Sequence, residues 1–208
     1  MDDHVVITLF RHGLTEGNKR KAYMGWNDSP LSEEAREMLG TYTFKEQDYD
    51  AFFSSDIKRC LNTMNILFPF VNPLLLSEFR EMNFGVFQGK TYEEIKDDGD
   101  YQAWVNDFFH GTPPQGESFT EFTARVEEGW KKVAHVIIQE GKRRPFIVTH
   151  GGVIRYILKQ FGPEKKDYWD WKIAHGHGYE MTFDLGQLRR GERCILLQEV
   201  PLTESELG

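Results

Sequence analysis

The chain has 208 residues, which fits one domain of ordinary size with a proper hydrophobic core. Its apolar content of 39%, with 14% aromatic residues, is typical of a globular protein and excludes a disordered one. The formal net charge of −8 argues against a general binder of nucleic acid or of anionic membranes, but a local cluster of arginine and histidine could still attract a small anionic substrate.

The sequence carries no signal for export or for membrane insertion. Residues 1–4 lack the basic and apolar regions of a signal peptide, and no apolar run approaches the ~20 residues that a membrane helix needs. Cys60 and Cys194 form no CxxC pair and no metal-binding spacing, although the sequence leaves a disulfide between them open. We therefore expect a reduced, cytoplasmic protein, a monomer or homodimer, without a metal or cofactor.

The first half of the chain predicts strands that alternate with a helix. Residues 5–10 (VVITLF) are a continuous, β-branched apolar run, typical of a strand buried on both faces. Residues 51–54 predict a shorter strand, followed by a helix from about 56 to 67. Residues 74–76 predict a short edge strand, because the preceding Pro73 limits its pairing.

The middle of the chain predicts helices around a loop. Residues 101–109 are expected to be helical, and residues 111–116 (GTPPQG) form a loop. Ser118 and Glu121 then make a capping box for a long helix that ends at Gly141. Its apolar residues recur at steps of three and four, which predicts a core helix; they are Phe119, Phe122, Val126, Trp130, Val133 and Ile137.

The last third predicts a second buried strand and a closing pair of strands. Residues 145–149 form the buried strand, and residues 152–161 the helix after it. Residues 181–188 and 194–200 are expected to be strands with Gly191 in the turn. This order of elements predicts an α/β fold with a mainly parallel sheet covered on both faces.

Two histidines follow the two buried strands directly. The first segment is residues 9–13 (LFRHG) and the second is residues 147–152 (IVTHGG). If the strands are neighbours, His12 and His150 lie beside Arg11 at the edge where such sheets bind ligands. Two imidazoles and a guanidinium at one point predict a site for a phosphoryl group. The Arg-His-Gly motif alone is weak evidence for such a site, because His12 could also be an ordinary histidine at the end of a strand.

Two further segments support an anion site. Arg59 falls in the first turn of the predicted helix after residues 51–54, where free N–H groups and the guanidinium both favour phosphate. Taken alone, Arg59 would be an ordinary surface arginine. Residues 78–85 (EFREMNFG) place acidic side chains in a loop-like, partly apolar setting, which makes them candidate proton donors.

Residues 9–18 (LFRHGLTEGN) resemble the signature of the histidine phosphatase superfamily, also called phosphoglycerate mutase-like. The similarity continues in order through nearly the whole chain, at residues 25–32, 54–63, 80–89, 113–118 and 148–152. The resemblance implies a three-layer α/β sandwich as one domain over residues 1–208. A helical insertion at about 90–117 is expected over the active site.

The resemblance also implies individual roles. His12 is expected to be the nucleophile and Glu81 the proton donor, with Arg11, Arg59 and protonated His150 around the phosphate. The expected substrate-binding residues are Asn18, Thr15, Gly151, Tyr23 and Trp104. For Tyr23 and Trp104, the alternative role is packing of the helical insertion on the core. The ordinary imidazole pKa near ~6.5 makes a neutral nucleophile accessible at pH 7, and side chains supply the positive charge that a metal would otherwise provide.

The branch within the family is indicated by the residues after Glu81. Mutases of this family typically read Glu-Arg-His-Tyr-Gly there, whereas residues 81–85 of this chain read EMNFG. The chain is more similar to short bacterial phosphatases, either broad-specificity phosphatases or α-ribazole phosphatase. Gln88 stands where these proteins usually have glutamate, so no role is assigned to it.

The expected function is therefore hydrolysis of a small phosphorylated metabolite, α-ribazole 5'-phosphate being one candidate, through a phosphohistidine. Alternatives are a phosphoglycerate mutase-type phosphotransferase, a non-catalytic phospholigand-binding protein, and a metal hydrolase that uses His12, His150, His175 and His177. No HxxxH or CxxC spacing supports the metal hydrolase. Residues 175–179 form a loop whose two histidines either approach the site or face solvent, and a solvent-exposed loop is the expectation.

Overall fold

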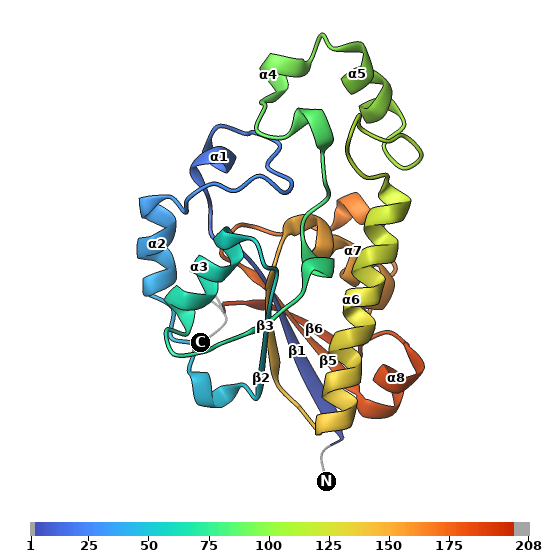
Figure 1. Cartoon of the computed structure of the whole chain (residues 1–208). Helices are drawn as coiled ribbons and strands as arrows, with labels where there is room; N and C mark the ends of the chain where they lie inside the picture. Colours follow the sequence, from blue (N-terminus) through green and yellow to red (C-terminus); the bar gives the residue numbers. More distant parts are fainter. Residues whose placement is uncertain (1–2, 202–208) are drawn as a thin grey trace.

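The protein is built on a six-stranded sheet with the order β3-β2-β4-β1-β5-β6 (Figure 1). The computed structural model describes residues 3–201; the remaining positions of the expected 1–208 domain, including the first two of residues 1–4, lie outside the described residues. The strands are β1 (His4–Arg11), β2 (Ala51–Ser54), β3 (Leu74–Leu75), β4 (Pro145–Thr149), β5 (Gly178–Asp184) and β6 (Leu196–Val200). The first four run parallel, and β5 is antiparallel to both β1 and β6. This mainly parallel sheet confirms the expected fold class.

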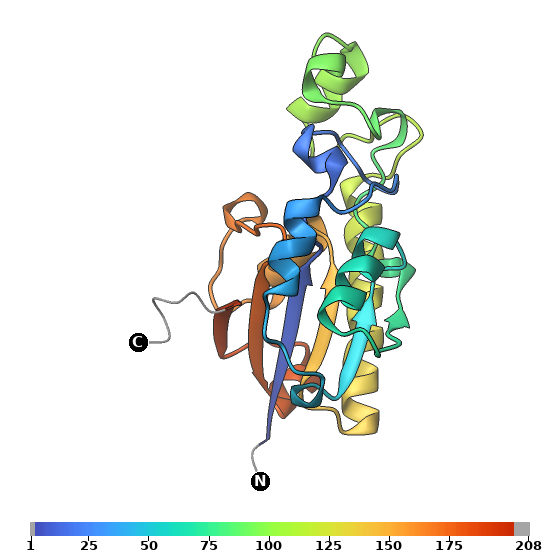
Figure 2. The ribbon, with the colours of Figure 1, turned by 90° about the vertical axis from the view of Figure 1, so that its left-hand side faces the viewer.

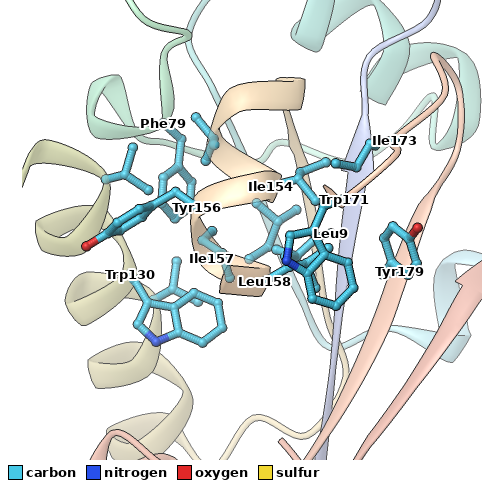
Figure 3. Close-up of a cluster of buried hydrophobic side chains, with 14 of the residues drawn as sticks. Leu9, Phe79, Trp130, Ile154, Tyr156, Ile157, Leu158, Trp171, Ile173 and Tyr179 are labelled. Atoms are coloured by element: carbon cyan, nitrogen blue, oxygen red, sulfur yellow. The ribbon is translucent and has the colours of Figure 1, made fainter. Parts of the chain in front are cut away.

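Helices cover both faces of the sheet (Figures 1 and 2). One face packs against α2 (Glu33–Gly40) and α3 (Lys58–Leu67). The other packs against α6 (Phe119–Glu140), α7 (Gly151–Phe161) and α8 (Leu185–Arg190). Leu9 packs on the side of α6, α7 and α8, and Phe10 packs on the side of α2 and α3. Both side chains are fully buried, which explains why the apolar run of β1 is uninterrupted. Figure 3 shows Leu9 beside Ile154 and Leu158 of α7.

A helical segment lies beyond the carboxyl ends of the parallel strands, at the top of Figure 1. It contains α4 (Tyr92–Ile95) and α5 (Gly99–Asn106), of which α5 ends three residues earlier than predicted. The remaining short elements are α1 (Glu16–Lys19), η1 (Glu46–Asp48), η2 (Ser77–Phe79), η3 (Gly85–Phe87) and η4 (Tyr168–Asp170). Within residues 3–201, no helix combines the length and apolarity that spanning a membrane requires.

The C-terminal prediction is wrong in one place. The strand expected at residues 181–188 begins at Gly178 and ends at Asp184, and α8 replaces its second half. The Asp184 side chain accepts hydrogen bonds from the N–H groups of Gly186 and Gln187, and this cap starts the helix. Gly191 ends α8 in the left-handed conformation rather than forming a tight hairpin turn.

Candidate active site

The pairing of β1 with β4 brings His12 and His150 together. Arg11 is paired with Thr149, and the His12 N–H donates to the Thr149 carbonyl at 3.0 Å. The two imidazole ring centres are 5.1 Å apart, and the residues are 3% and 0% exposed. The structure therefore places both histidines at one edge of the sheet, as the two similar sequence segments predict.

Arg59, in the first turn of α3, bridges the two rings. Its Nε lies 3.2 Å from His12 Nε2, and its Nη2 lies 3.2 Å from His150 Nδ1. The remaining guanidinium N–H groups donate to the carbonyls of Asn27 at 2.7 Å and Gly25 at 2.6 Å. Because a guanidinium only donates hydrogen bonds, both imidazole nitrogens that face it must accept.

This geometry fixes the proton positions on the two rings. His12 Nδ1–H donates to the Gly13 carbonyl at 2.8 Å, so the lone pair lies on Nε2. On His150 the proton lies on Nε2, which is 2.9 Å from Ser55 Oγ. Burial, followed by the nearby Arg59 charge, holds the pKa of both imidazoles well below the ordinary value of 6.5. His150 is therefore neutral here, contrary to the protonated state expected from the sequence.

Arg59 is buried and Arg11 is half-buried, and neither cation has a close counter-ion in the described part of the chain. Neither lies within 4.0 Å of a carboxylate oxygen among residues 3–201. Arg11 Nη1 donates to the Ile173 carbonyl at 2.6 Å, whereas its buried Nε has no hydrogen-bond partner in the described part of the chain. Burial lowers the Arg11 pKa to about 10, so the group stays charged at neutral pH. A buried donor and uncompensated positive charge together form an anion site.

Glu81 lies at the start of α7. Its Oε1 accepts from the Met82 N–H at 3.0 Å, and its Oε2 accepts from the Gly152 N–H at 3.0 Å. Burial lowers the pKa of both Arg11 and Arg59, and the negative charge of the Glu81 carboxylate partly offsets this lowering. A Cβ on Gly152 would lie 2.2 Å from Glu81 Oε1, so only glycine allows this approach.

His175 was expected in a solvent-exposed loop, and this expectation is wrong. Its ring centre is 5.1 Å from that of His12, and its Nδ1 is 3.4 Å from the His12 carbonyl oxygen. The Gly176 N–H lies 3.2 Å from the carbonyls of both Arg11 and His12, which fixes the loop over β1. Burial, followed by the Arg11 charge, lowers the His175 pKa to about 3.

The three histidines of the site, two buried and His175 half-buried, should make the fold acid-sensitive. In the unfolded chain each imidazole takes up a proton below about pH 6.5, whereas in the folded protein His12, His150 and His175 do not. The free energy of unfolding should therefore fall from pH 6.5 to pH 5, by up to about 1.4 kcal/mol per pH unit for each ring. Urea unfolding across this range measures the slope. H175N should make it shallower, whereas exposed His135→Asn should not.

The other predicted residues lie at three places. Thr15 Oγ1 donates to Asn18 Oδ1 at 2.8 Å within the cap of α1, and no hydrogen bond in the described structure joins either side chain to the histidines. Gly151 packs against the Arg11 guanidinium, since a Cβ there would lie 3.1 Å from its Cζ. Tyr23 and Trp104 line a pocket beside Glu81.

This pocket has a volume of about 480 Å³ and opens beside Glu81 and Gly152. Arg155 is the only cationic residue in its lining as far as the described residues show. The rest of the lining is aromatic or apolar and consists of Tyr23, Met82, Phe84, Trp104, Val105, Phe108, Tyr168 and Trp169. No cluster of three or more His, Cys, Asp or Glu side chains suited to a metal ion occurs within residues 3–201.

The sequence reasoning missed several contacts around the histidines. Ser55 and Cys60 both contact His150 Nε2, at 2.9 and 3.5 Å, and Thr63 Oγ1 accepts from the Gly13 N–H at 3.0 Å. All three are buried and flank the predicted Arg59. The signal that could have placed Cys60 and Thr63 was their position on α3, where Cys60 follows Arg59 directly and Thr63 lies one turn later.

Known proteins are similar to this chain over most of its length. Residues 7–190 match the profile of the histidine phosphatase superfamily (branch 1). A 2,3-bisphosphoglycerate-dependent phosphoglycerate mutase of Cytophaga hutchinsonii is 27% identical over 97% of this chain and 99% of its own. A broad-specificity phosphatase of Saccharomyces cerevisiae is 31% identical over 76% of this chain and 71% of its own.

A solved structure is similar as well. The α-ribazole phosphatase from Shigella flexneri superposes with a TM-score of 0.74 at 25% identity, over 85% of this chain and 90% of its own. The superfamily match spans both strand–histidine–glycine segments, Arg59 and Glu81, which the fold brings to one edge of the sheet. The chain belongs to the histidine phosphatase superfamily, branch 1.

Proposed function

We propose that this protein is a metal-independent phosphomonoesterase that hydrolyses a small phosphorylated metabolite through a phosphohistidine. The observation that carries the proposal is the lone pair of His12 Nε2, which faces buried Arg59, with half-buried Arg11 as a second guanidinium; neither guanidinium has a close carboxylate partner among the described residues. A neutral imidazole can attack phosphorus, and the two cations hold the equatorial oxygens. We further propose a cytoplasmic location, which the two free, buried cysteines support.

The first half-reaction transfers the phosphoryl group to His12. Its Nε2 forms the N–P bond as the P–O bond to the alcohol breaks, and Arg11 and Arg59 stabilise the negative charge on the transferring oxygens. Protonated Glu81 donates its proton to the leaving oxygen. The Gly13 carbonyl accepts from His12 Nδ1–H throughout and so stabilises the positive charge that develops on the ring.

The second half-reaction returns His12 to its starting state. Glu81, now a carboxylate, accepts a proton from a water molecule as the water oxygen attacks phosphorus. The N–P bond breaks and inorganic phosphate leaves. The N–H groups of Met82 and Gly152 hold the carboxylate in place between the two steps.

The pocket beside Glu81 supports a phosphatase over a mutase. The alcohol leaves on the Glu81 side, where the lining is mostly aromatic and apolar. Met82 and Phe84 belong to this lining and occupy the positions that carry polar residues in the mutase pattern. We propose an ester whose alcohol carries a flat apolar group; α-ribazole 5'-phosphate, after the Shigella flexneri relative, is the first metabolite to test.

Benzyl and methyl phosphate separate apolar recognition from chemical reactivity, because their alcohols have similar acidity. We expect kcat/KM for the benzyl ester to be about 10–100-fold higher, as burial of an aromatic ring contributes about 2 kcal/mol or more. Trp169→Ala should reduce this ratio, since Trp169 lines the pocket and is 53% exposed. F70A removes an exposed ring outside this lining and should leave the ratio unchanged.

Hydrolysis of p-nitrophenyl phosphate in excess EDTA tests the reaction class. Turnover in EDTA supports the proposal and removes the metal hydrolase. Loss of turnover that added Zn²⁺ restores would favour the metal hydrolase. Absence of turnover for every phosphomonoester, with retained binding of inorganic phosphate, would favour a phospholigand-binding protein.

Gly152→Ala should disable the acid without touching the nucleophile. The new Cβ would lie 2.2 Å from Glu81 Oε1 and so displace the carboxyl group. We expect kcat/KM for methyl phosphate to fall about tenfold or more, because small misplacements of a catalytic group are costly. The matched control is G40A, where a Cβ meets nothing within 4 Å. An unchanged rate in Gly152→Ala would contradict the placement of Glu81.

A further inference from the structure

Arg125 of α6 holds the main chain around Glu81. Its Nη1 donates to the carbonyl oxygens of Glu78 at 2.8 Å and Arg80 at 3.0 Å. Its Nη2 donates to the carbonyl oxygen of Glu81 itself at 3.3 Å. One guanidinium therefore satisfies three carbonyls of the segment that delivers the proposed acid.

Glu117 completes this attachment from the other side of the segment. Its Oε1 accepts from Arg125 Nη2 at 2.5 Å and from the Asn83 N–H at 2.8 Å. The Glu117 N–H donates back to the Asn83 carbonyl at 3.0 Å. The Arg125 and Glu117 side chains are only 20% and 14% exposed, so water screens this ion pair weakly.

Trp26 adds a second donor to the Glu81 carbonyl. Its Nε1 donates to the Glu81 carbonyl at 2.8 Å. The guanidinium carbons of Arg80 and Arg125 lie 4.9 and 5.8 Å from the centre of the indole ring. Stacking on the indole fixes the planes of both guanidinium groups. The Glu81 carbonyl thus accepts from two donors, while among the described residues its carboxyl group accepts hydrogen bonds only from the N–H groups of Met82 and Gly152.

We propose that Arg125 is a positioning residue for the general acid: it sets the place of the Glu81 carboxyl group through the main chain of residues 78–81. The proposal rests on the proposed phosphatase activity with Glu81 as proton donor. Among the described hydrogen bonds, loss of the guanidinium leaves the carbonyls of Glu78 and Arg80 without a donor. It also leaves the Glu81 carbonyl with Trp26 alone and the Glu117 carboxylate with the Asn83 N–H alone, so the segment must shift to find new partners. The nucleophile and the two phosphate-site arginines make no direct contact with Arg125 in the described structure.

The consequence is a specific kinetic signature. A displaced acid slows esters whose alcohol needs a proton and spares esters whose leaving group is stable as an anion. For Arg125→Gln we expect kcat/KM for benzyl phosphate to fall about tenfold or more, with p-nitrophenyl phosphate within about threefold of wild type. R125K keeps a donor and should recover part of the loss.

Lys132→Met is the matched control. Lys132 lies on the same helix and pairs with the exposed side of the same segment, at the Glu78 carboxylate. It contacts no carbonyl of residues 78–81 within the described hydrogen bonds, so both substrates should keep the wild-type rate within about twofold. Equal losses on the two esters in R125Q, or the same pattern in Lys132→Met, would overturn the proposal.

A double-mutant cycle makes the test independent of general destabilisation. If Arg125 acts through Glu81, adding R125Q to the E81Q variant should not lower kcat/KM for benzyl phosphate any further. Multiplicative losses would show that Arg125 acts elsewhere. If R125Q does not fold, the same cycle can be measured with R125K or E117Q in place of R125Q. Failure of the proposed function would be distinguishable from failure of this proposal. In that case the wild-type protein would show no turnover, or the loss of rate in E81Q would not depend on the leaving group.

Discussion

Replacement of His12 with alanine should abolish the phosphoenzyme and lower kcat by at least about a thousandfold, the usual cost of removing a catalytic nucleophile. His12 Nε2 turns its lone pair toward Arg59, and His12 directly follows Arg11, so both guanidinium groups can hold the incoming oxygens, whereas the ring of His150 is fully buried. In His150, the nitrogen facing Arg59 is Nδ1, and its Nε2 carries the proton toward Ser55. Neither other histidine should therefore substitute for the nucleophile.

Binding of inorganic phosphate distinguishes lost chemistry from a lost site. Arg11 and Arg59 remain in His12→Ala, so calorimetric titration should still detect phosphate. His135→Ala changes an exposed histidine of α6 and should leave turnover unaltered. A labelled phosphoenzyme that persists in His12→Ala at the wild-type level would contradict the assignment.

Replacement of Glu81 with glutamine should divide the substrates by their leaving groups. Glutamine keeps the size and the hydrogen-bond acceptor for the Gly152 N–H but cannot deliver a proton to an alkoxide. General acid catalysis contributes about 10²–10⁴-fold, so kcat/KM for methyl and benzyl phosphate should fall within that range. For p-nitrophenyl phosphate the loss should stay below about tenfold, because nitrophenolate leaves without protonation.

A series of phenyl phosphates with increasingly acidic phenols measures this dependence. The slope of log kcat/KM against phenol pKa should be steeper in E81Q than in wild type. Equal slopes would remove Glu81 from the role of general acid. Arg80→Gln, which removes the neighbouring Asp56 ion pair, serves as a control for general disturbance of this segment.

The features predicted from the sequence were those that depend on local pattern. The run at residues 5–10 and the run at 145–149 required buried strands, and their pairing then placed His12 beside His150. Ser118 and Glu121 marked the start of α6, whose predicted stripe is buried apart from a half-buried Phe119. The position of Arg59 followed from a helix that begins directly after β2.

The features that were missed depend on sheet order, which no local pattern contains. His175 meets His12 because β5 pairs antiparallel with β1 and Gly178 lies opposite Phe10. The neutral state of His150 follows from full burial beside Arg59, and burial cannot be read from the residue itself. Likewise Arg125 is 44 residues from Glu81 in sequence and reaches it only because α6 packs on η2.

The site of phosphorylation tests the central claim most directly. Wild-type protein mixed with substrate in EDTA, quenched in alkali and digested, can be analysed by ³¹P NMR and mass spectrometry of the His12 peptide. The structure predicts phosphorus on His12 Nε2, because Nδ1 is held by the Gly13 carbonyl. Phosphorus on Nδ1, on His150 or His175, or on no histidine during active turnover would contradict the account.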